Sequence, residues 1–380
     1  MSKNGGIQRV LHSLAEGLNK ENDIYICTQM EENETSYYSY DDDIRFIYLG
    51  QYIKRKDPLS RFIRKFCRKY GIVFSKRSVL NAFYDKRNLD FIENILMKYK
   101  FDCVIGIQGY YSILLSQINR KKLMNTKIYG WVHNTYEAYF ETPGLYYYGE
   151  YCIAKKYLKN LDGIITLTKH DEERYRNEFD VKAHCIYNPL SFKEIHLTDY
   201  KRNHLFFVGR LYRKQKGLDY LIDILKRIFM SEVSEKWDCW IIGDGPDSKW
   251  LKSEIINAGI ENRVILWGER DDVQELYGQA SLLLSTSRWE GFGLVVTEAF
   301  SSGVPVVAFN NSGPAEIIYN GINGILVDKY DVEKFAEKTL DLMKDSIKLK
   351  QYSHKAIERS TDFNIEHIVE QWNAFLSKVD

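Results

Sequence analysis

The chain has 380 residues, which is too long for one ordinary hydrophobic core and suits two domains of roughly 150 to 200 residues each. Its 53 Lys and Arg residues nearly balance 52 Asp and Glu residues, so a net charge of +1 excludes a global field that would hold nucleic acid. We find no secretory signal in the opening residues and no run approaching the roughly 20 apolar residues of a membrane span, so we predict a cytoplasmic protein. Six cysteines without a Cys-x-x-Cys pair fit reduced thiols better than a disulfide framework or a zinc site.

The first half of the chain alternates strand-like and helix-like segments. A glycine pair, Gly5 and Gly6, precedes an amphipathic helix predicted over residues 7–18. The predicted strands are residues 24–28, 44–49, 103–107, 127–131, 163–167 and 182–186. Asn188-Pro189 ends the last of them and opens a polar, irregular stretch, so we place the domain boundary there.

The second half shows the same alternation more clearly. Its predicted strands are residues 204–208, 239–242, 264–267, 282–285, 304–309 and 324–327, separated by helical patterns such as residues 217–229 and 332–343. Strands that alternate with helices indicate a parallel sheet covered on both faces. Apolar residues in the final segment, 364–379, fall on one helical face, which predicts a last helix with a buried side.

A glycine-containing loop follows the predicted strand 282–285 and leads into a helix that begins near Leu294. Free N–H groups and the positive end of the helix dipole make such a helix start a binding site for a diphosphate. Gly291 and Gly293 let the backbone approach a ligand closely. Glu290 and Glu298 flank the helix start, where a carboxylate is useful only if it accepts hydrogen bonds from ribose or hexose hydroxyls. On spacing alone, a solvated carboxylate is the more common interpretation of each.

A basic loop follows the predicted strand 204–208. Gly209 makes the turn, and the cations are Arg210, Arg213, Lys214 and Lys216. In an open parallel sheet they would lie at the carboxyl ends of the strands, where they could stabilise a departing diphosphate without a metal ion. A solvated basic loop is the alternative.

Together these motifs resemble those of family 4 glycosyltransferases. GRL and KG within 209–217, GDGP at 243–246, EGFGLVVTE at 290–298, and the pattern of Ala299, Gly303, Pro305 and Val306 follow that family's order over about residues 203–327. The resemblance implies an α/β fold of the GT-B class, with two Rossmann-like doubly wound domains facing a central cleft. We therefore expect an acceptor-side domain at residues 1–188, a nucleotide-sugar-binding domain at 189–355, and a C-terminal helix at 356–380 that packs back on the first domain.

The resemblance also implies roles for residues of the second domain. Arg210 and Lys216 would contact the donor diphosphate, and Glu298 would bind the ribose. Glu290 would act as a catalytic residue against the transferred sugar. The other residues implied in donor binding, beside the sugar and phosphate or near the base, are Gly291, Phe292, Gly293, Leu294, Gly268 and Arg270.

In the first domain the resemblance is thinner. It implies that Gly6 binds the donor and that His133, in Val132-His133-Asn134, is a catalytic residue beside the donor sugar, although a lone His after a strand is as readily structural. The family begins with a strand ahead of the glycine loop, whereas this sequence has only residues 1–4 there. We expect either a shortened start or a sheet that lacks a central strand, which would leave neighbouring backbone groups unpaired.

The implied activity is retaining transfer of a hexose or N-acetylhexosamine from a nucleotide diphosphate sugar, with UDP as the expected nucleotide, to a lipid-linked or growing cell-surface glycan. Relatives would be enzymes of capsular, exopolysaccharide and lipopolysaccharide-core synthesis. Same-face attack, with the departing phosphate taking the acceptor's proton, is favoured, and covalent catalysis stays open. No metal or other cofactor is expected. The alternatives are a nucleotide-sugar epimerase on the same scaffold, a metal-dependent GT-A transferase that uses Asp41, Asp42 and Asp43, and an inactive nucleotide-sugar-binding protein.

The segment from Lys54 to Arg87 is strongly basic. Twelve Lys and Arg less two Asp give it a local charge of +10, and apolar residues interleave with the cations: Phe62, Ile63, Phe66 and Tyr70. Charge and apolar side chains together suit an anionic membrane surface, so our hypothesis is peripheral attachment at the inner face of the cell membrane, where a lipid-linked acceptor is presented. A solvated helix and loop is the alternative. The aromatic run at 136–151 suits stacking of an acceptor sugar and core packing equally well.

Overall fold

The structure is a computed structural model that describes residues 5–30, 37–50, 58–71, 83–190, 192, 197–198 and 202–379. It divides into two compact units. Unit 1 consists of Met1–Pro189 and Ile365–Asp380, and unit 2 of Leu190–Asn364. The first boundary lies one residue beyond the predicted one, whereas the second lies at Asn364 rather than at residue 355, because a helix runs across residue 355 within unit 2.

Unit 2 is built on one parallel sheet. Its strands are β7 (His204–Val208), β8 (Asp238–Ile242), β9 (Val264–Gly268), β10 (Leu282–Ser285), β11 (Val306–Phe309) and β12 (Gly324–Val327). They lie in the order β12-β11-β10-β7-β8-β9, so the first strand is in the middle and pairs with β8 on one edge and β10 on the other. In such a doubly wound sheet, ligands bind beyond the carboxyl ends of the strands.

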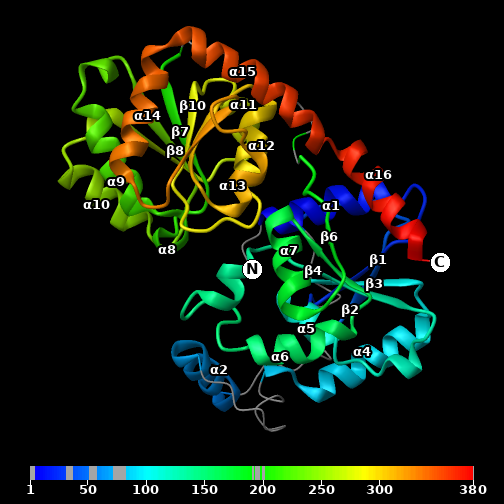
Figure 1. The fold of residues 1–380 in the computed structure, drawn as a ribbon. Coiled ribbons are helices and arrows are strands. Elements are labelled where there is room, and N and C mark those ends of the chain that lie inside the picture. The colour runs from blue at the N-terminus through cyan, green and yellow to red at the C-terminus, as the bar shows by residue number, and fades with distance from the viewer. Residues whose placement is uncertain are drawn as a thin grey trace. The chain divides into compact units, whose positions relative to one another are not determined.

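Helices cover both faces of this sheet. They are α8 (Arg213–Lys216), α9 (Leu218–Phe229), α10 (Ser248–Asn257), α11 (Val273–Tyr277), α12 (Leu294–Ser301), α13 (Ser312–Ile317), α14 (Val332–Lys344) and α15 (Ser346–Ser360). Leu221, Ile224, Leu225 and Ile228 of α9 recur at helical spacing and are buried, which gives this helix its apolar face. Figure 1 shows α9, α10 and α14 on one side of the sheet and α11, α12 and α13 on the other.

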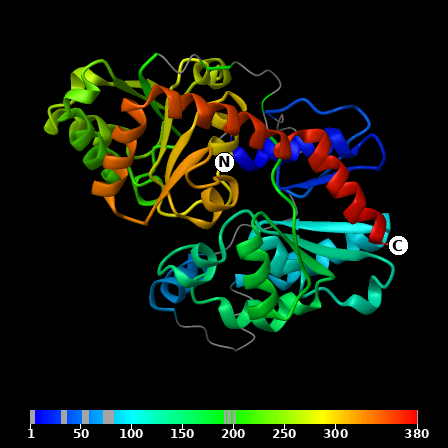
Figure 2. The same ribbon diagram turned by 45° about the horizontal axis from the view of Figure 1, so that its top comes forward.

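Unit 1 contains two separate parallel ladders. One pairs β1 (Tyr25–Thr28) with β2 (Arg45–Tyr48), and the other joins β3 (Cys103–Ile107), β4 (Lys127–Trp131), β5 (Gly163–Thr166) and β6 (Ala183–Cys185) in that order. Among the described residues no strand connects β1 to β3. Figure 2 shows the β1–β2 pair, in blue, as a ladder distinct from the four-stranded sheet. The residues at which the family's first strand was sought, 1–4, lie outside the described residues.

The helices of unit 1 surround these ladders. They are α1 (Gly6–Leu18), α2 (Pro58–Tyr70), α4 (Lys86–Tyr99), α5 (Gln108–Leu115), α6 (Tyr151–Tyr157), α7 (Lys169–Phe179) and α16 (Ile365–Leu376). The last helix packs on α1 so closely that a Cβ on Gly17 would come within 2.4 Å of the Val369 side chain. Trp372 is fully buried and lies edge-on to Trp131 of β4, at 5.0 Å between ring centroids. The C-terminal helix therefore belongs to the core of unit 1.

Short turns complete the secondary structure. The 3-10 turns are Arg120–Lys122, Leu158–Asn160, Glu232–Ser234, Glu261–Arg263, Thr361–Phe363 and Ser377–Val379, and a π turn spans Glu137–Glu141. The six cysteines are free. Within the part of the chain that the structure describes, we see no helix with the length and apolar character needed to span a bilayer.

Candidate functional site

The loops that follow β7, β8 and β9 of unit 2 lie against one another. The backbone N–H of Gly209 donates to the carbonyl of Ile242 at 3.0 Å, and that of Gly243 donates to Gly268 at 2.7 Å. Because all these residues stand at the carboxyl ends of parallel strands, they form one continuous edge. Gly268 of the predicted donor-binding set is therefore part of this edge, next to the loop after β8.

Two glycines on this edge allow backbone approaches that no other residue permits. A Cβ on Gly217 would lie 2.2 Å from the carbonyl oxygen of Thr286, and a Cβ on Gly243 would lie 2.1 Å from that of Gly209. Both glycines also have positive φ, at 60° and 130°. The hydroxyl of Thr286 donates to the carbonyl of Lys216 at 2.8 Å. The loop after β10 is thereby joined to the loop after β7.

Lys216 and Glu290 meet at this junction. The Lys216 ammonium lies 2.6 Å from a Glu290 carboxylate oxygen, and the two side chains are only 13% and 16% exposed. The Ser287 hydroxyl donates to the same carboxylate oxygen at 3.1 Å. The Lys216 stem runs beneath Gly209, where a Cβ would lie 3.3 Å from the Lys216 Cε. Two residues that the sequence predicted for one site, from segments 74 positions apart, are thus in contact.

The loop that carries Glu290 is held from several sides. The Asn311 side-chain amide donates to the carbonyl of Ser287 at 2.6 Å, and a Cβ on Gly313 would lie 2.5 Å from a carbonyl of the loop. Gly293 caps α12 with φ of 104°, and the helix begins at Leu294. The first N–H groups of a helix have no acceptor within it, so they and the helix dipole favour an anion at this place. The arrangement offers an ammonium, backbone donors and a carboxylate beside them.

The other predicted cations differ in placement. Arg210 is exposed where β7 ends. Arg213 turns away toward α10, since its guanidinium lies over the Trp250 ring at 4.6 Å. Arg288, which the sequence interpretation did not single out, donates to the Arg213 carbonyl at 2.9 Å and to the Asp219 carboxylate at 3.0 Å. Arg288 therefore ties the two loops together, and its place inside the glycine-rich segment was the only indication of this role.

Two further residues of the predicted set flank the edge. Arg270 donates to Asp272 at 2.8 Å and lies over the Trp267 ring at 5.4 Å, just beyond Gly268. Glu298 lies one turn into α12 and is only 2% exposed. The structure thus brings Lys216, Glu290 and the start of α12 together, whereas Glu298 is buried on α12. Its contact with a ribose stays a prediction.

In unit 1, Gly6 is the first residue of α1, directly after the N-cap Gly5, whose N–H donates to the Gln8 side chain at 2.9 Å. His133 follows β4 and packs against Trp131 at 4.3 Å between ring centroids. Both of its ring nitrogens are buried without a hydrogen-bond partner in the described part of the chain. Burial lowers the pKa of His133 to about 3, so its imidazole is neutral at physiological pH and can exchange hydrogen bonds with a hydroxyl but supplies no positive charge.

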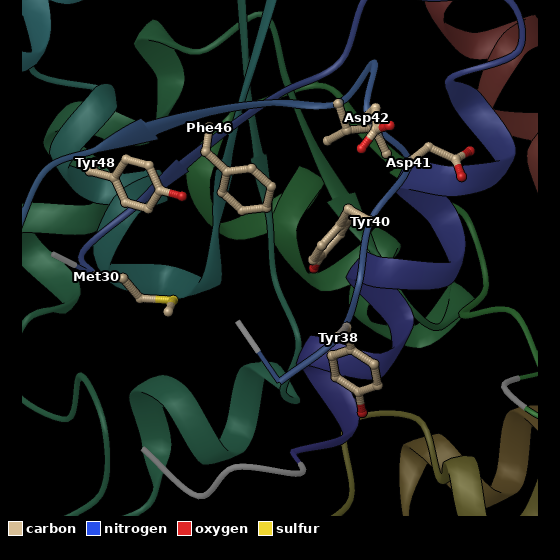
Figure 3. A pocket seen from close by; sticks show the side chains of 8 residues that line it. Met30, Tyr38, Tyr40, Asp41, Asp42, Phe46 and Tyr48 are labelled. Atoms are coloured by element: carbon tan, nitrogen blue, oxygen red, sulfur yellow. The ribbon is translucent and has the colours of Figure 1, made fainter. Parts of the chain in front are cut away.

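Unit 1 also contains a pocket of about 310 Å³ that the sequence interpretation missed (Figure 3). Its lining residues are Met30, Tyr38, Tyr40, Asp41, Asp42, Ile44, Phe46 and Tyr48. Ile44, Phe46 and Tyr48 alternate along one side of β2, and that alternation was its only signal in the sequence. Because the lining has two carboxylates and no cation, this pocket does not suit a diphosphate.

The aspartates of the GT-A alternative lie in the turn just before β2. Among the residues that the structure describes, no group of three or more His, Cys, Asp and Glu side chains is placed to hold a metal ion. The aromatic run at 136–151 contributes Tyr136, Tyr139, Phe140 and Tyr147 to the hydrophobic core of unit 1. Core packing therefore accounts for these four rings.

The basic segment between Lys54 and Arg87 includes α2; residues 54–57 and 72–82 of it lie outside the described residues. Phe62, Phe66 and Tyr70, spaced four residues apart, are 66%, 43% and 54% exposed. On the other side of the helix Cys67 is buried in the core of unit 1. A stripe of aromatic rings with cations beside it therefore faces solvent along α2.

Parts of the chain match a protein family and known proteins in sequence. Residues 191–359 match the family described as glycosyl transferases group 1. The chain is 41% identical over 145 residues to an exopolysaccharide phosphotransferase of Streptomyces coelicolor, a match that covers 38% of this chain and 15% of that protein. It is 28% identical over 252 residues to a poly(ribitol-phosphate) alpha-N-acetylglucosaminyltransferase of Staphylococcus aureus, covering 65% of this chain and 50% of that protein. The chain thus spans half or less of the length of these curated relatives.

Among solved structures, the chain is similar to S. aureus TarM in complex with fondaparinux, alpha-GlcNAc-glycerol and UDP. The TM-score is 0.72 at 18% sequence identity, over 98% of this chain and 97% of that one. At this identity the likeness concerns the fold. The α/β fold of the GT-B class predicted from the sequence is confirmed, and the GT-A alternative is thereby excluded.

Proposed function

We propose, from the membership of residues 191–359 in the glycosyl transferases group 1, that the chain transfers a hexose or N-acetylhexosamine from a nucleotide diphosphate sugar to a cell-surface glycan, with retention at the anomeric carbon. One observation carries this proposal: the Lys216–Glu290 pair beside the start of α12. A diphosphate needs a cation and backbone N–H groups, and a sugar needs an acceptor for its hydroxyls. At this edge of unit 2, the cation is Lys216, the N–H groups are those at the start of α12, and the acceptor is the Glu290 carboxylate.

The donor diphosphate would lie between the Lys216 ammonium and the N–H groups at the start of α12, with Arg210 reaching it from the exposed end of β7. The Glu290 carboxylate would leave Lys216 and accept hydrogen bonds from hydroxyls of the transferred sugar. Glu298 would hold the ribose, and Gly268 and Arg270 would border the base.

In the transfer step, the bond between the anomeric carbon and the phosphate oxygen breaks, and a bond to the acceptor oxygen forms on the same face of the sugar. The departing diphosphate accepts the proton of the acceptor hydroxyl, so the products are the glycoside and the free nucleoside diphosphate. The charge that develops on the leaving group would be stabilised by the Lys216 ammonium and the N–H groups at the start of α12. His133, as a neutral imidazole, would hydrogen-bond a sugar hydroxyl, which stays a prediction from the resemblance.

UDP is the nucleotide we propose. UDP is bound in the TarM complex, and the S. aureus relative is named as an alpha-N-acetylglucosaminyltransferase. An alpha linkage made from an alpha-linked nucleotide sugar is a retention of configuration. The experiment is a calorimetric comparison of UDP and GDP binding to the chain, followed by transfer assays with the UDP-sugars that bind.

A matched pair of variants tests the site itself. Lys216→Met removes a charge-assisted hydrogen bond to the diphosphate, typically worth about 1.5–3 kcal/mol, so the dissociation constant of UDP should rise at least tenfold. Lys214→Met, on the exposed side of the same short helix, should leave it within twofold. Equal UDP binding by the two variants, or conversion of the donor to an epimer without acceptor, would contradict the proposal.

We further propose that α2 holds the protein at an anionic membrane surface. Arg61, Lys65 and Lys69 recur four residues apart beside the exposed stripe of Phe62, Phe66 and Tyr70, so lipid headgroups would meet the cations while the rings enter the interface. A polybasic surface gains about 1 kcal/mol per Lys or Arg near an anionic membrane. Changing the three cations to Gln should therefore weaken binding to phosphatidylserine vesicles at low salt at least tenfold.

The control variant for α2 removes the same number of positive charges from unit 2. Lys236, Lys249 and Lys252 of unit 2 are exposed, and their change to Gln alters the net charge equally. Co-sedimentation with phosphatidylserine and phosphatidylcholine vesicles measures both triple variants. Equal loss in the two variants, or no binding by the parent chain, would show that α2 is a solvated helix.

A further inference from the structure

Arg288 lies between the loops after β7 and β10 and contacts both. Its guanidinium donates to the Arg213 carbonyl at 2.9 Å and to the two Asp219 carboxylate oxygens at 3.0 and 2.5 Å. Its backbone N–H donates to the carbonyl of Gln215 at 2.7 Å. The side chain is 22% exposed, and the guanidinium lies over the Tyr220 ring at 4.2 Å. The loop after β10, the short helix α8 and the start of α9 therefore meet at this one residue.

The helix that Arg288 contacts cannot hold its own shape. α8 has four residues, and so short a helix is not stable without partners for its backbone. The last carbonyls of a helix find no donor within it, and a positive charge is favourable at that end. Here the carbonyl of Lys216 accepts from the Thr286 hydroxyl at 2.8 Å. The carbonyls of Arg213 and Gln215 accept from Arg288, so the loop after β10 supplies donors along the whole of α8.

Asp219 and Tyr220 of α9 hold the guanidinium in turn. The pairing with both Asp219 oxygens uses the planar fork of an arginine, which a single ammonium does not reproduce. Burial alone would raise the pKa of Asp219, but the hydrogen bonds and the charge of Arg288 bring this pKa below its ordinary value. The Tyr220 ring packs edge-on to the buried ring of Phe309 on β11, at 5.6 Å between ring centroids. Arg288 is therefore fixed to the core of unit 2 by an ionised partner and a ring.

Arg288 also stands beside both members of the Lys216–Glu290 pair. Glu290 follows Arg288 by two residues, and the preceding residue, Ser287, donates through its hydroxyl to the Glu290 carboxylate at 3.1 Å. Lys216 is the last residue of α8, and its ammonium lies 2.6 Å from a Glu290 carboxylate oxygen. A shift of Arg288 would therefore displace the two side chains of the pair relative to each other.

We propose that Arg288, held by Asp219, is a positioning residue that keeps Lys216 and Glu290 in the geometry a donor diphosphate requires. The inference rests on the proposed function, because the ligand that senses this geometry is UDP. The guanidinium is directed at the Arg213 carbonyl and at Asp219, so it acts on the ligand through α8 and not by contact. Misplacement of a binding group by on the order of 1 Å can cost about a hundredfold, so a clamp of this kind has a measurable effect.

Asp219→Asn tests the proposal through the sign of its effect. If Asp219 acted only through its negative charge, its removal would tighten the binding of a diphosphate. A positioning role predicts the opposite: the dissociation constant of UDP should rise about tenfold, because an amide cannot hold the arginine fork as a carboxylate does. Asp223→Asn, exposed one turn further along α9, is the matched control and should leave UDP binding within about twofold, since an exposed charge is screened by salt. Tighter or unchanged UDP binding by Asp219→Asn, measured by calorimetry, would overturn the proposal.

Arg288→Lys separates the charge of Arg288 from its shape. A cation that bound the diphosphate directly would keep much of its effect as a lysine and lose it as a methionine. A positioning residue should lose its effect equally in Arg288→Lys and Arg288→Met, because one ammonium cannot span the carboxylate and the Arg213 carbonyl as the fork does. Arg227→Met, exposed on α9, is the control for the lost charge. Retention of parental UDP affinity by Arg288→Lys would contradict the proposal, as a merely structural residue would change the free energy of unfolding and not the affinity of the folded chain.

Hydrogen exchange without nucleotide reads the clamp independently of the donor site. Residues 213–217 should exchange about tenfold faster in Asp219→Asn and Arg288→Met than in the two control variants, because α8 opens more readily when its donors are lost. Exchange in β8 and β9 should not change, since neither strand contacts the clamp. If the parent chain binds no nucleoside diphosphate, the proposed function fails, and this exchange still decides whether Arg288 and Asp219 order α8. Unchanged exchange of residues 213–217 in both variants would overturn the inference whatever the UDP affinities.

Discussion

Unit 2 has one continuous parallel sheet, whereas the described strands of unit 1 form two separate parallel ladders. In unit 2, β7 lies at the centre, and its Leu205, Phe206 and Phe207 are buried between the two halves of a continuous sheet. In unit 1 no described strand joins β1 to β3, and all residues of these two strands except the buried Gly106 are half-buried or exposed. The central strand β7 therefore completes the ladders on both of its sides, and the loop that follows it holds residues of the proposed donor site. In unit 2 that loop carries Lys216.

The largest expected loss of stability comes from Gly217, because this glycine allows the loop after β7 to contact the loop after β10. Gly217→Ala places a Cβ 2.2 Å from the Thr286 carbonyl and keeps a positive φ, so we expect unit 2 to lose about 3–5 kcal/mol, as in other severe steric substitutions. Gly259→Ala is the control, because Gly259 also has positive φ but nothing within 4 Å of the added Cβ. It should lose only about 1 kcal/mol, the cost of the left-handed conformation. Urea unfolding measures both, and equal losses would show that the contact with Thr286 is unimportant.

Because unit 2 has a continuous sheet and the described strands of unit 1 form two separate ladders, truncating a strand side chain to Ala should lower the free energy of unfolding by different amounts in the two units. Leu205→Ala, at the fully buried centre of β7, should cost about 2–5 kcal/mol. Ile105→Ala, on β3, which pairs with β4 alone among the described strands, should cost about 1 kcal/mol because this side chain is only half-buried. Hydrogen exchange of β7 and of β4 reports the loss within each unit. A cost at Ile105 equal to that at Leu205 would mean that the β3 edge is already covered.

A change of pH should act on unit 1 through His133. Its folded pKa, lowered to about 3 by burial, lies below the ordinary value of 6.5, so only the unfolded chain takes up this proton between those values. Stability therefore falls as the pH drops below 6.5, by up to about 1.4 kcal/mol per pH unit. His133→Asn removes this slope, which urea titrations at pH 7.5, 6.5 and 5.5 would reveal.

Asp171 of α7 acts in the opposite direction in the same unit. Burial raises its pKa to about 6, above the ordinary 3.8, so the folded chain takes up this proton first and gains stability as the pH falls from 6 to 3.8. The two effects partly cancel below pH 6. The difference between the parent chain and His133→Asn isolates the histidine, and parallel slopes for the two proteins would contradict its neutral, buried state.

Much of the fold was accessible from the sequence, because its signals are local. Runs such as 204–208 and 282–285 are bounded by turn residues and proved to be β7 and β10. The predicted strand 304–309 begins later, at Val306, since Pro305 has no N–H to offer a ladder. The sequence resemblance assigned Lys216 and Glu290 to one donor site, and the structure places the two side chains in contact.

The remaining features depend on contacts that spacing does not encode. The enclosure of Glu298 depends on how α12 packs, and the turn of Arg213 toward Trp250 depends on α10, so neither was visible in the sequence. The pocket beside β2 gathers residues from two segments with only a brief alternation to mark them. The second domain boundary was placed too early, since nothing in the pattern shows that α15 continues to Ser360.

The smallest expected effect concerns one of the hydrogen bonds between the loops after β7 and β10. Thr286→Val keeps the shape of the side chain but removes the hydroxyl that donates to the Lys216 carbonyl at 2.8 Å. Because Thr286 is fully buried, the carbonyl loses this donor without gaining water, at a cost of about 1 kcal/mol. Thr297→Val of α12, whose hydroxyl bonds within its own helix to Leu294, is the control. If the bond positions Lys216 rather than only stabilising unit 2, Thr286→Val should also weaken UDP binding about threefold while Thr297→Val leaves it unchanged. Identical UDP affinities in the two variants would confine the role of Thr286 to stability.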